Sequence, residues 1–230
     1  MKKFKKALVL FLCAVLLVAG SVMGTLAYLT SQDTVVNTFT VGDIAIILDE
    51  ANVDEMGNVI DETRVKTNDY HLLPGHSYVK DPTVTIRNDS EPAYVRMMVT
   101  VNNVKALKAA MPDYVATDGV FMLQYLIEGW DSTMWQYVAC VETANGEATV
   151  ATYEFRYRDI ESPAVPGTDK TYVEANEMLP LFTAINMPGA ALTNEKIANL
   201  DGVIITVDAH AIQADGFANA DAAWTAFNAA

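Results

Sequence analysis

Histidine is the side chain here best suited to bind a transition metal or to carry a proton near neutral pH, and the chain has three of them. His71 and His76 flank the turn residues Pro74 and Gly75, whereas His210 lies far along the chain. The His-Glu-x-x-His pattern of zinc proteases, the Gly-x-Ser-x-Gly pattern of serine hydrolases and the phosphate-binding and dinucleotide-binding glycine motifs do not occur. We therefore predict no catalytic residues, no metal site and no cofactor.

A second group of residues that could do chemistry consists of acids. Asp-Glu pairs begin at positions 49, 54 and 61, around the turn signal Met56-Gly57-Asn58. An EF-hand calcium loop needs oxygen ligands at fixed offsets from a central glycine. With Gly57 in that place, Met56 falls on a ligand position and Thr63 replaces the terminal glutamate. The pattern favours a solvated hairpin or loop, with weak calcium binding by an irregular loop as the alternative.

Cysteine chemistry is limited to two residues. Cys13 lies in the apolar N-terminal run, and Cys140 lies in the apolar segment Tyr137–Val141. A reactive cysteine needs surroundings that stabilise its thiolate, and this segment offers none. We expect Cys140 to be a buried structural cysteine.

The first residues form a targeting segment. Lysines at positions 2, 3, 5 and 6 precede the apolar run Ala7–Met23, and small residues at Thr25 and Ala27 follow. This order is that of a secretory signal peptide, so residues 1–27 are predicted to be removed by cleavage between Ala27 and Tyr28. The alternative is a retained membrane anchor, for which the apolar run is at the short limit.

The net charge and length of the mature chain limit its possible ligands and its number of domains. Removing the four N-terminal lysines takes the formal net charge from −14 to −18. Such a charge opposes binding to nucleic acid or to anionic lipid. The remaining chain, residues 28–230, is long enough for one sizeable core, so we predict a single domain.

Alternation of apolar and polar residues dominates that domain and indicates half-buried strands. Faces of this kind occur at Val35, Asn37, Phe39 and Val41, at Ile44, Ile46 and Leu48, at Val84 and Ile86, at alternate residues of Ala93–Val101, at Tyr153, Phe155 and Tyr157, and at Val203, Ile205, Val207, Ala209 and Ala211. Shorter strands are expected at 120–127, 134–141 and 178–185, short helices at 104–111, 194–200 and 219–227, and a loop at 159–170. The predicted fold class is all-β: an antiparallel β-sandwich with a few short helices.

Several segments resemble the TasA and camelysin-like family of secreted proteins from Gram-positive bacteria. The resemblance rests first on the junction Ala27-Tyr28 and the strand from Asn37 to Gly42. Three later segments are also similar: Leu73-Pro74-Gly75 with Lys80-Asp81-Pro82-Thr83-Val84, Ala93-Tyr94-Val95-Arg96, and Ala209 to Phe217.

The resemblance implies several properties. Members of this family carry SipW-dependent signal peptides, processed by a dedicated signal peptidase that would be a partner during export. The fold is then a jelly roll, and the protein is secreted, extracellular or attached to the cell surface. Its function is that of a structural subunit of extracellular fibres in a biofilm matrix. Self-association is expected, with other matrix proteins as further partners and no binding of nucleic acid.

In such fibres the N-terminal strand of one subunit completes the sheet of a neighbour. Once Ala27 is cleaved, residues 28–41 form a free segment with strand pattern, and its backbone suits pairing with an exposed sheet edge. Val35, Phe39 and Val41, together with Asn37, form the predicted assembly face. The alternative is that this strand packs within its own domain.

Two other functions remain open at this stage. Camelysin-like relatives have been described as surface metalloproteases, although this chain has no recognisable zinc motif. A binding module for carbohydrate or cell wall is the other alternative. Its aromatic platforms would come from Tyr94, Trp130, Trp135, Tyr153 and Tyr157, which at strand spacing are more often core residues.

Overall fold

A computed structural model describes residues 4, 6, 11–15, 43–145, 148–158, 172–189 and 192–229. The chain divides into two compact units, Met1–Val41 and Gly42–Ala230. The described residues of the first unit are helical. Within the described part of the chain, no helix has both the length and the hydrophobicity needed to cross a bilayer.

Several predictions concern residues outside this description. They are the cleavage site at Ala27 and Tyr28, the assembly face at Val35, Asn37, Phe39 and Val41, and the loop at 159–170.

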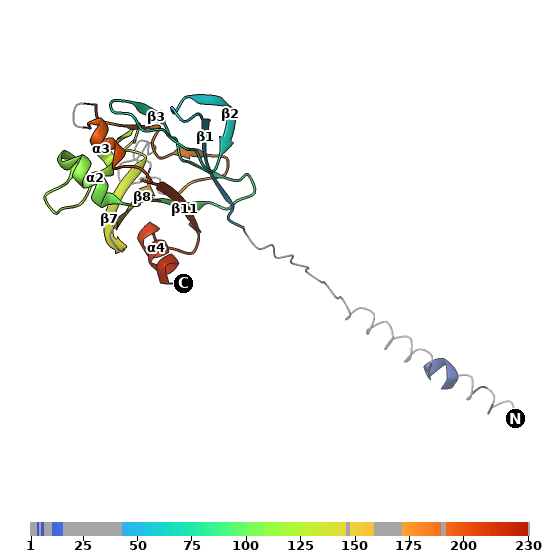
Figure 1. The fold of residues 1–230 in the computed structure, drawn as a ribbon. Coiled ribbons are helices and arrows are strands. Elements are labelled where there is room, and N and C mark those ends of the chain that lie inside the picture. The colour runs from blue at the N-terminus through green and yellow to red at the C-terminus, as the bar shows by residue number, and fades with distance from the viewer. Residues whose placement is uncertain are drawn as a thin grey trace. The chain divides into compact units, whose positions relative to one another are not determined.

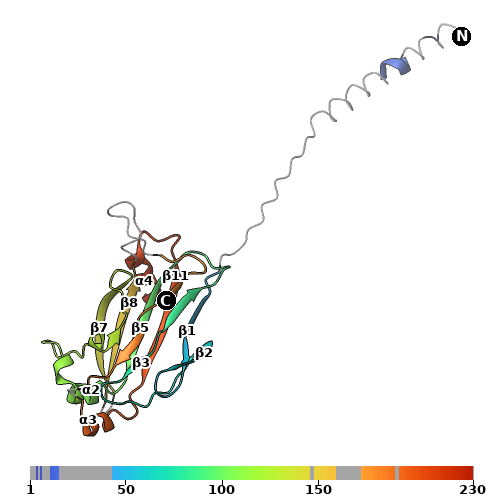
Figure 2. The same ribbon diagram turned by 90° about the horizontal axis from the view of Figure 1, so that it is seen from above.

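The second unit is mostly β, with three antiparallel sheets and a few short helices (Figure 1). The first sheet has the order β2-β1-β4-β9, with β1 at Ile46–Val53, β2 at Val59–Val65, β4 at Thr83–Ile86 and β9 at Met178–Pro180. The second has the order β3-β10-β6, with β3 at Ser77–Val79, β10 at Ala184–Asn186 and β6 at Ile127–Glu128. The third has the order β11-β5-β8-β7, with β11 at Ile205–Gln213, β5 at Ala93–Val101, β8 at Ala148–Tyr157 and β7 at Trp135–Asn145. These four strands lie side by side in Figure 2.

The predicted period-two strands form the core. Val95, Met97, Val99 and Val101 of β5 are at most 1% exposed and pack with residues from all three sheets in one cluster. The opposite face of β5 carries Tyr94, Arg96, Met98 and Thr100, as alternation predicts. Met98 and Thr100 are half-exposed, but Tyr94 and Arg96 are buried, because a C-terminal helix covers them.

The predicted helices are present as α2 (Val104–Ala110), α3 (Asn194–Ala198) and α4 (Ala220–Ala229), with short 3₁₀ turns at Pro112–Tyr114 and Leu123–Tyr125. Two strand predictions were wrong in detail. The segment 120–127 is interrupted by the 3₁₀ turn Leu123–Tyr125, which separates an isolated β-bridge at Phe121 from the start of β6 at Ile127. The segment 178–185 divides into β9 and β10, which belong to different sheets.

The acidic segment is a β-hairpin of β1 and β2. Asp54 Oδ1 accepts hydrogen bonds from the backbone N–H groups of Met56 and Asn58, both at 2.9 Å. Gly57 lies in the left-handed region with φ of 77°, and a Cβ placed there would be 2.7 Å from the Cα of Tyr78. The turn therefore requires glycine both for its backbone angle and for its contact with β3.

Candidate functional site

The most distinctive surface of the described residues is the open edge of β11. This strand is an end strand of its sheet and pairs with β5 through nine successive residues without a bulge. Asn102 N–H donates to the carbonyl of Ile204, and Ala214 N–H donates to the carbonyl of Pro92. In an antiparallel pair, residues that exchange hydrogen bonds with the partner strand alternate with residues that do not. The even-numbered residues of β11 therefore exchange hydrogen bonds with β5. The odd-numbered residues direct their N–H and C=O groups away from β5. We call this row of backbone groups, from residues 205 to 213, the β11 edge.

The side chains of those odd-numbered residues point into the core but are not fully covered. The apolar residues concerned are Val203, Ile205, Val207, Ala209 and Ala211, all packed against the core cluster yet partly exposed. Ile46 and Leu48 of β1 are in the same state. An incompletely covered apolar row beside an unpaired backbone is what a sheet shows where a further strand would fit.

The other long edges carry features that discourage pairing. β7 has a register shift between Tyr137 and Ala139, and a bulge of this kind interrupts the row of backbone groups. Its Glu142 accepts the backbone N–H of Phe121 at 2.9 Å and pairs with Lys108 at 2.6 Å, which ties this edge to neighbouring segments. β11 has neither of these features.

β2 and β9 are protected differently. β2 carries three charged residues, Asp61, Glu62 and Arg64, and its pairing with β1 also shifts register. β9 has only three residues and ends in Pro180, which has no N–H to donate. Charge, bulges and proline are the usual ways in which proteins block edge-to-edge association. In the described structure β11 is a long edge with no bulge and no proline, and its one acidic residue, Asp208, belongs to the even-numbered set that bonds to β5.

The outer face of β11 is held by helix α4. Arg96 of β5 is 5% exposed, and its guanidinium lies 4.6 Å from the ring centre of Trp224 and 4.9 Å from that of Phe227. It donates to Asn228 Oδ1 at 2.9 Å and, through Nε, to Nδ1 of His210 at 3.1 Å. The His210 ring stacks on Phe227 at 5.1 Å. α4 is therefore attached to β11 and β5 through one buried cation and the rings around it.

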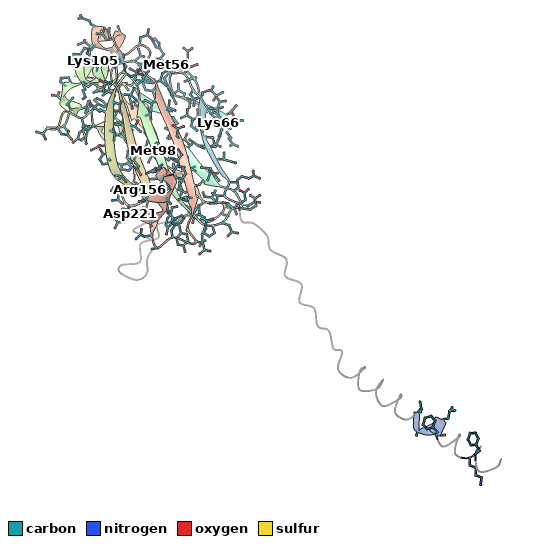
Figure 3. All side chains as sticks on the ribbon, turned by 90° about the horizontal axis from the view of Figure 1, so that it is seen from below. Met56, Lys66, Met98, Lys105, Arg156 and Asp221 are labelled. Carbon is teal, nitrogen blue, oxygen red and sulfur yellow. The ribbon has the colours of Figure 1, made fainter. Side chains whose placement is uncertain are left out.

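His210 can accept the Arg96 hydrogen bond only when Nδ1 carries no proton. Burial and the neighbouring Arg96 charge lower the pKa of His210, against the opposing effects of Asp208 and Glu154. Arg156 extends the cluster by pairing with Glu154 at 2.6 Å and with Asp221 of α4 at 2.7 Å. Figure 3 shows Arg156 and Asp221 close together at this end of the sheet.

The three histidines do not converge. His76 lies within 2.8 Å of the carbonyl of Met56 and packs edge-on against Tyr78, while His210 lies under α4. In the part of the chain that the structure covers, no group of three or more His, Cys, Asp or Glu side chains is placed to hold a metal ion.

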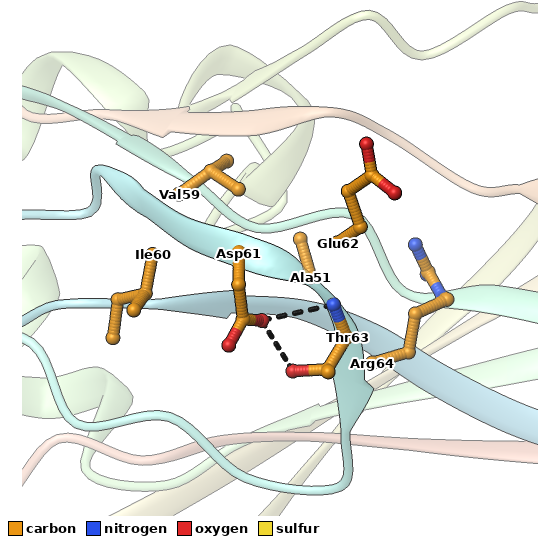
Figure 4. Close-up of a pocket in the computed structure, with 7 residues that line it drawn as sticks. All are labelled: Ala51, Val59, Ile60, Asp61, Glu62, Thr63 and Arg64. Carbon is orange, nitrogen blue, oxygen red and sulfur yellow. Dashed lines mark hydrogen bonds between the residues drawn. The ribbon is translucent and has the colours of Figure 1, made fainter.

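The acidic hairpin uses its carboxylates internally. A shallow pocket on β1 and β2 is lined by Ala51 and residues 59–64 (Figure 4). There Asp61 Oδ1 accepts hydrogen bonds from the backbone N–H and the hydroxyl of Thr63, which lower the pKa of Asp61. Arg64 pairs with Asp49 at 2.5 Å and with Asp81 at 2.9 Å. These acids stabilise a hairpin, whose strand β2 is exposed over residues 59–63.

Cys140 is half-buried, and its thiol has a pKa raised to about 11, chiefly by burial. At neutral pH the thiolate is therefore scarce, which fits the interpretation of a structural cysteine.

The aromatic platforms expected for a carbohydrate module are core residues. Tyr94, Trp135, Tyr153 and Tyr157 are at most 7% exposed. Trp130 is half-buried and donates its indole N–H to the carbonyl of Trp135 at 3.1 Å. In the second unit Tyr125 is 59% exposed, and the sequence pattern did not single it out.

Comparisons with known proteins add no assignment: no family model, no curated protein and no solved structure matches the chain. The site is therefore interpreted from its own geometry.

Proposed function

We propose that the chain is an exported structural subunit that assembles by strand exchange, with residues 28–41 of one copy pairing to the β11 edge of another. The observation that carries this proposal is the nine-residue edge without bulge, proline or lysine, beside an incompletely covered apolar row. Backbone pairing supplies affinity in such a joint, and side chains that enter alternate positions supply specificity.

The sequence of the segment suits this role. Asp33 is the one charged residue between Tyr28 and Val41, so the segment has little charge to keep in water. Val35, Phe39 and Val41 have the period-two spacing that matches the apolar row of β11. Export places the segment outside the cell, and cleavage after Ala27 frees its start. A jelly-roll arrangement of the three sheets belongs to the same proposal, as do the extracellular matrix and biofilm setting.

The proposal is tested with a pair of charge substitutions on opposite faces of the segment. Phe39→Asp places a carboxylate on the assembly face, and Thr40→Asp places the same charge on the other face. Filaments are counted by electron microscopy after mild acidification, which protonates carboxylates and reduces repulsion between subunits of net charge −18.

We expect filaments from the wild type and from Thr40→Asp, and none from Phe39→Asp. Equal filaments from both variants would exclude the exchanged strand. Cleavage of casein by the purified mature chain, dependent on added zinc, would instead support a metalloprotease.

A further inference from the structure

A trio of side chains, the buried Glu50 and Lys80 with the half-buried Asn68, lies away from the β11 edge. Lys80 Nζ lies 2.7 Å from Glu50 Oε2, and Asn68 Nδ2 lies 3.1 Å from Glu50 Oε1. Glu50 is 6% exposed and Lys80 is 8% exposed. One carboxylate therefore contacts both an amine and a side-chain amide, each through a different oxygen.

Two tyrosine rings border the trio. The Tyr70 ring lies 5.8 Å from Lys80 Nζ and packs edge-on against Tyr78. Burial is the largest cause that raises the pKa of Tyr70, and the nearby Glu50 charge raises it further. Transfer of a proton from Lys80 to Glu50 leaves two neutral partners, one of them an amine with a free electron pair.

Asn68 is held in a fixed orientation beside the same carboxylate that Lys80 contacts. Its Oδ1 accepts the backbone N–H of Val53 at 3.2 Å, and its Nδ2 donates to the carbonyl of Ala51 at 2.9 Å. The Val53 N–H would stabilise the negative charge that develops on Oδ1 when a nucleophile adds to Cγ. Because the reacting groups belong to one folded chain, the reaction needs no encounter.

We propose that Lys80 and Asn68 become joined by an amide bond between Nζ and Cγ, with Glu50 as the proton carrier and ammonia as the product. Glu50 takes one proton from the Lys80 ammonium, and the Nζ electron pair thus freed forms the bond to Cγ. Nζ then gives up a second proton as the Cγ–Nδ2 bond breaks. Glu50 passes both protons to the departing Nδ2, which leaves as ammonium, the protonated form of ammonia, and Glu50 is a carboxylate again. One C–N bond forms and one breaks, so no oxidant or other reactant is required.

The bond would link the segment after β2 to the segment between β3 and β4. After signal-peptide removal the chain has a single cysteine, Cys140, so a disulfide within one chain is not available to it. A covalent link of this kind would constrain the unfolded chain in the way a disulfide does.

Intact mass spectrometry of the purified mature chain is the first measurement. The proposal predicts a mass lower than that of the sequence by one ammonia. Lys80→Arg keeps a cation beside Glu50 but supplies no amine, so it should show the unmodified mass. Lys66→Arg, an exposed lysine on the same hairpin, is the matched control and should retain the loss.

A digest separates this bond from cyclisation of Asn68 with the following Asp69, which also releases ammonia. Chymotrypsin cuts the unfolded chain after Tyr70, Leu72 and Tyr78, between the two linked residues. The proposal predicts a branched peptide that contains both Asn68 and Lys80. An unmodified wild-type mass, or an ammonia loss that persists in Lys80→Arg, would overturn it.

Glu50→Gln provides an independent check on the proton carrier. It is expected to show the unmodified mass with the same circular dichroism spectrum as the wild type. If Glu50→Gln does not fold, the mass of Lys80→Arg still decides whether the bond forms.

Discussion

At the scale of single residues, positions that look alike in the sequence differ sharply in their surroundings. Gly57 and Gly119 each lie in a turn with an aspartate shortly before them, Asp54 and Asp118, and both have positive φ, at 77° and 85°. A Cβ at Gly57 would collide with the backbone of Tyr78, whereas a Cβ at Gly119 has nothing within 4 Å. The sequence predicts a turn at Gly57 but contains no sign of its contact with β3.

This difference yields a stability prediction. Gly119→Ala should lower the free energy of unfolding by about 1 kcal/mol, the cost of a left-handed backbone with a side chain. Gly57→Ala should lower it by a further 1–3 kcal/mol or so, because the backbone of Tyr78 must move. Urea denaturation of both variants provides the measurement, and equal losses would contradict the predicted contact.

At the scale of elements, the backbone groups of β11 form two sets. Those of the even-numbered residues bond to β5, and those of the odd-numbered residues face away from it. Proline removes an N–H, and its effect depends on where that group points. Ala209→Pro removes an outward-facing N–H, so it should leave the monomer folded and abolish filaments. Asp208→Pro removes a hydrogen bond to β5, so it should destabilise the monomer itself. Circular dichroism and electron microscopy of both variants test this, and filaments from Ala209→Pro would contradict it.

Helix α4 is a second element, and its docking on the sheet depends on the protonation of His210. It buries only Ala223 and Trp224 and is too short to be stable alone in water. The charged groups around His210 are Arg96, Asp208, Glu154, Arg156 and Asp221. The pKa of His210 is lowered when α4 is docked. The stabilisation of the docked helix by neutral His210 is therefore fully present above the ordinary histidine pKa of about 6.5. It is lost as the pH falls from there through the lowered value.

We therefore expect α4 to undock more readily between pH 7 and pH 5. Acrylamide quenching of Trp224, taken as the difference from a Trp224→Phe variant, should increase over that range. His210→Asn is the matched control, because its amide oxygen can accept the Arg96 hydrogen bond without titrating. The same pH dependence in His210→Asn would assign the effect to another group.

The elements also show where sequence reasoning succeeds. Alternation identified the inner faces of β5 and β11, because a pleated strand with one buried face imposes that pattern locally. It did not reveal that Arg96 is buried, since the covering helix begins more than a hundred residues later. The trio of Glu50, Asn68 and Lys80 was missed for the same reason: three separate segments bring it together.

At the scale of the whole molecule, net charge opposes the assembly that the β11 edge favours. With the net charge of −18 predicted for the chain after cleavage, subunits repel one another. Added salt reduces that repulsion by shortening the screening length from about 8 Å at physiological ionic strength to about 3 Å at 1 M. Filaments should therefore form at neutral pH when the salt concentration is raised, as they should on acidification. Light scattering across a salt series measures this. Scattering that decreases with salt would indicate an interface held by ion pairs.

The central claim is that an exchanged strand covers the β11 edge, and hydrogen exchange of individual amides tests it most directly. The wild-type chain in filaments is compared with the Phe39→Asp chain as a monomer. The account predicts that the amides of Val207, Ala209 and Ala211, which face away from β5, become protected in filaments, while those of the even-numbered residues change little. Unchanged exchange at these three amides, with new protection on β7 or β2 instead, would contradict it.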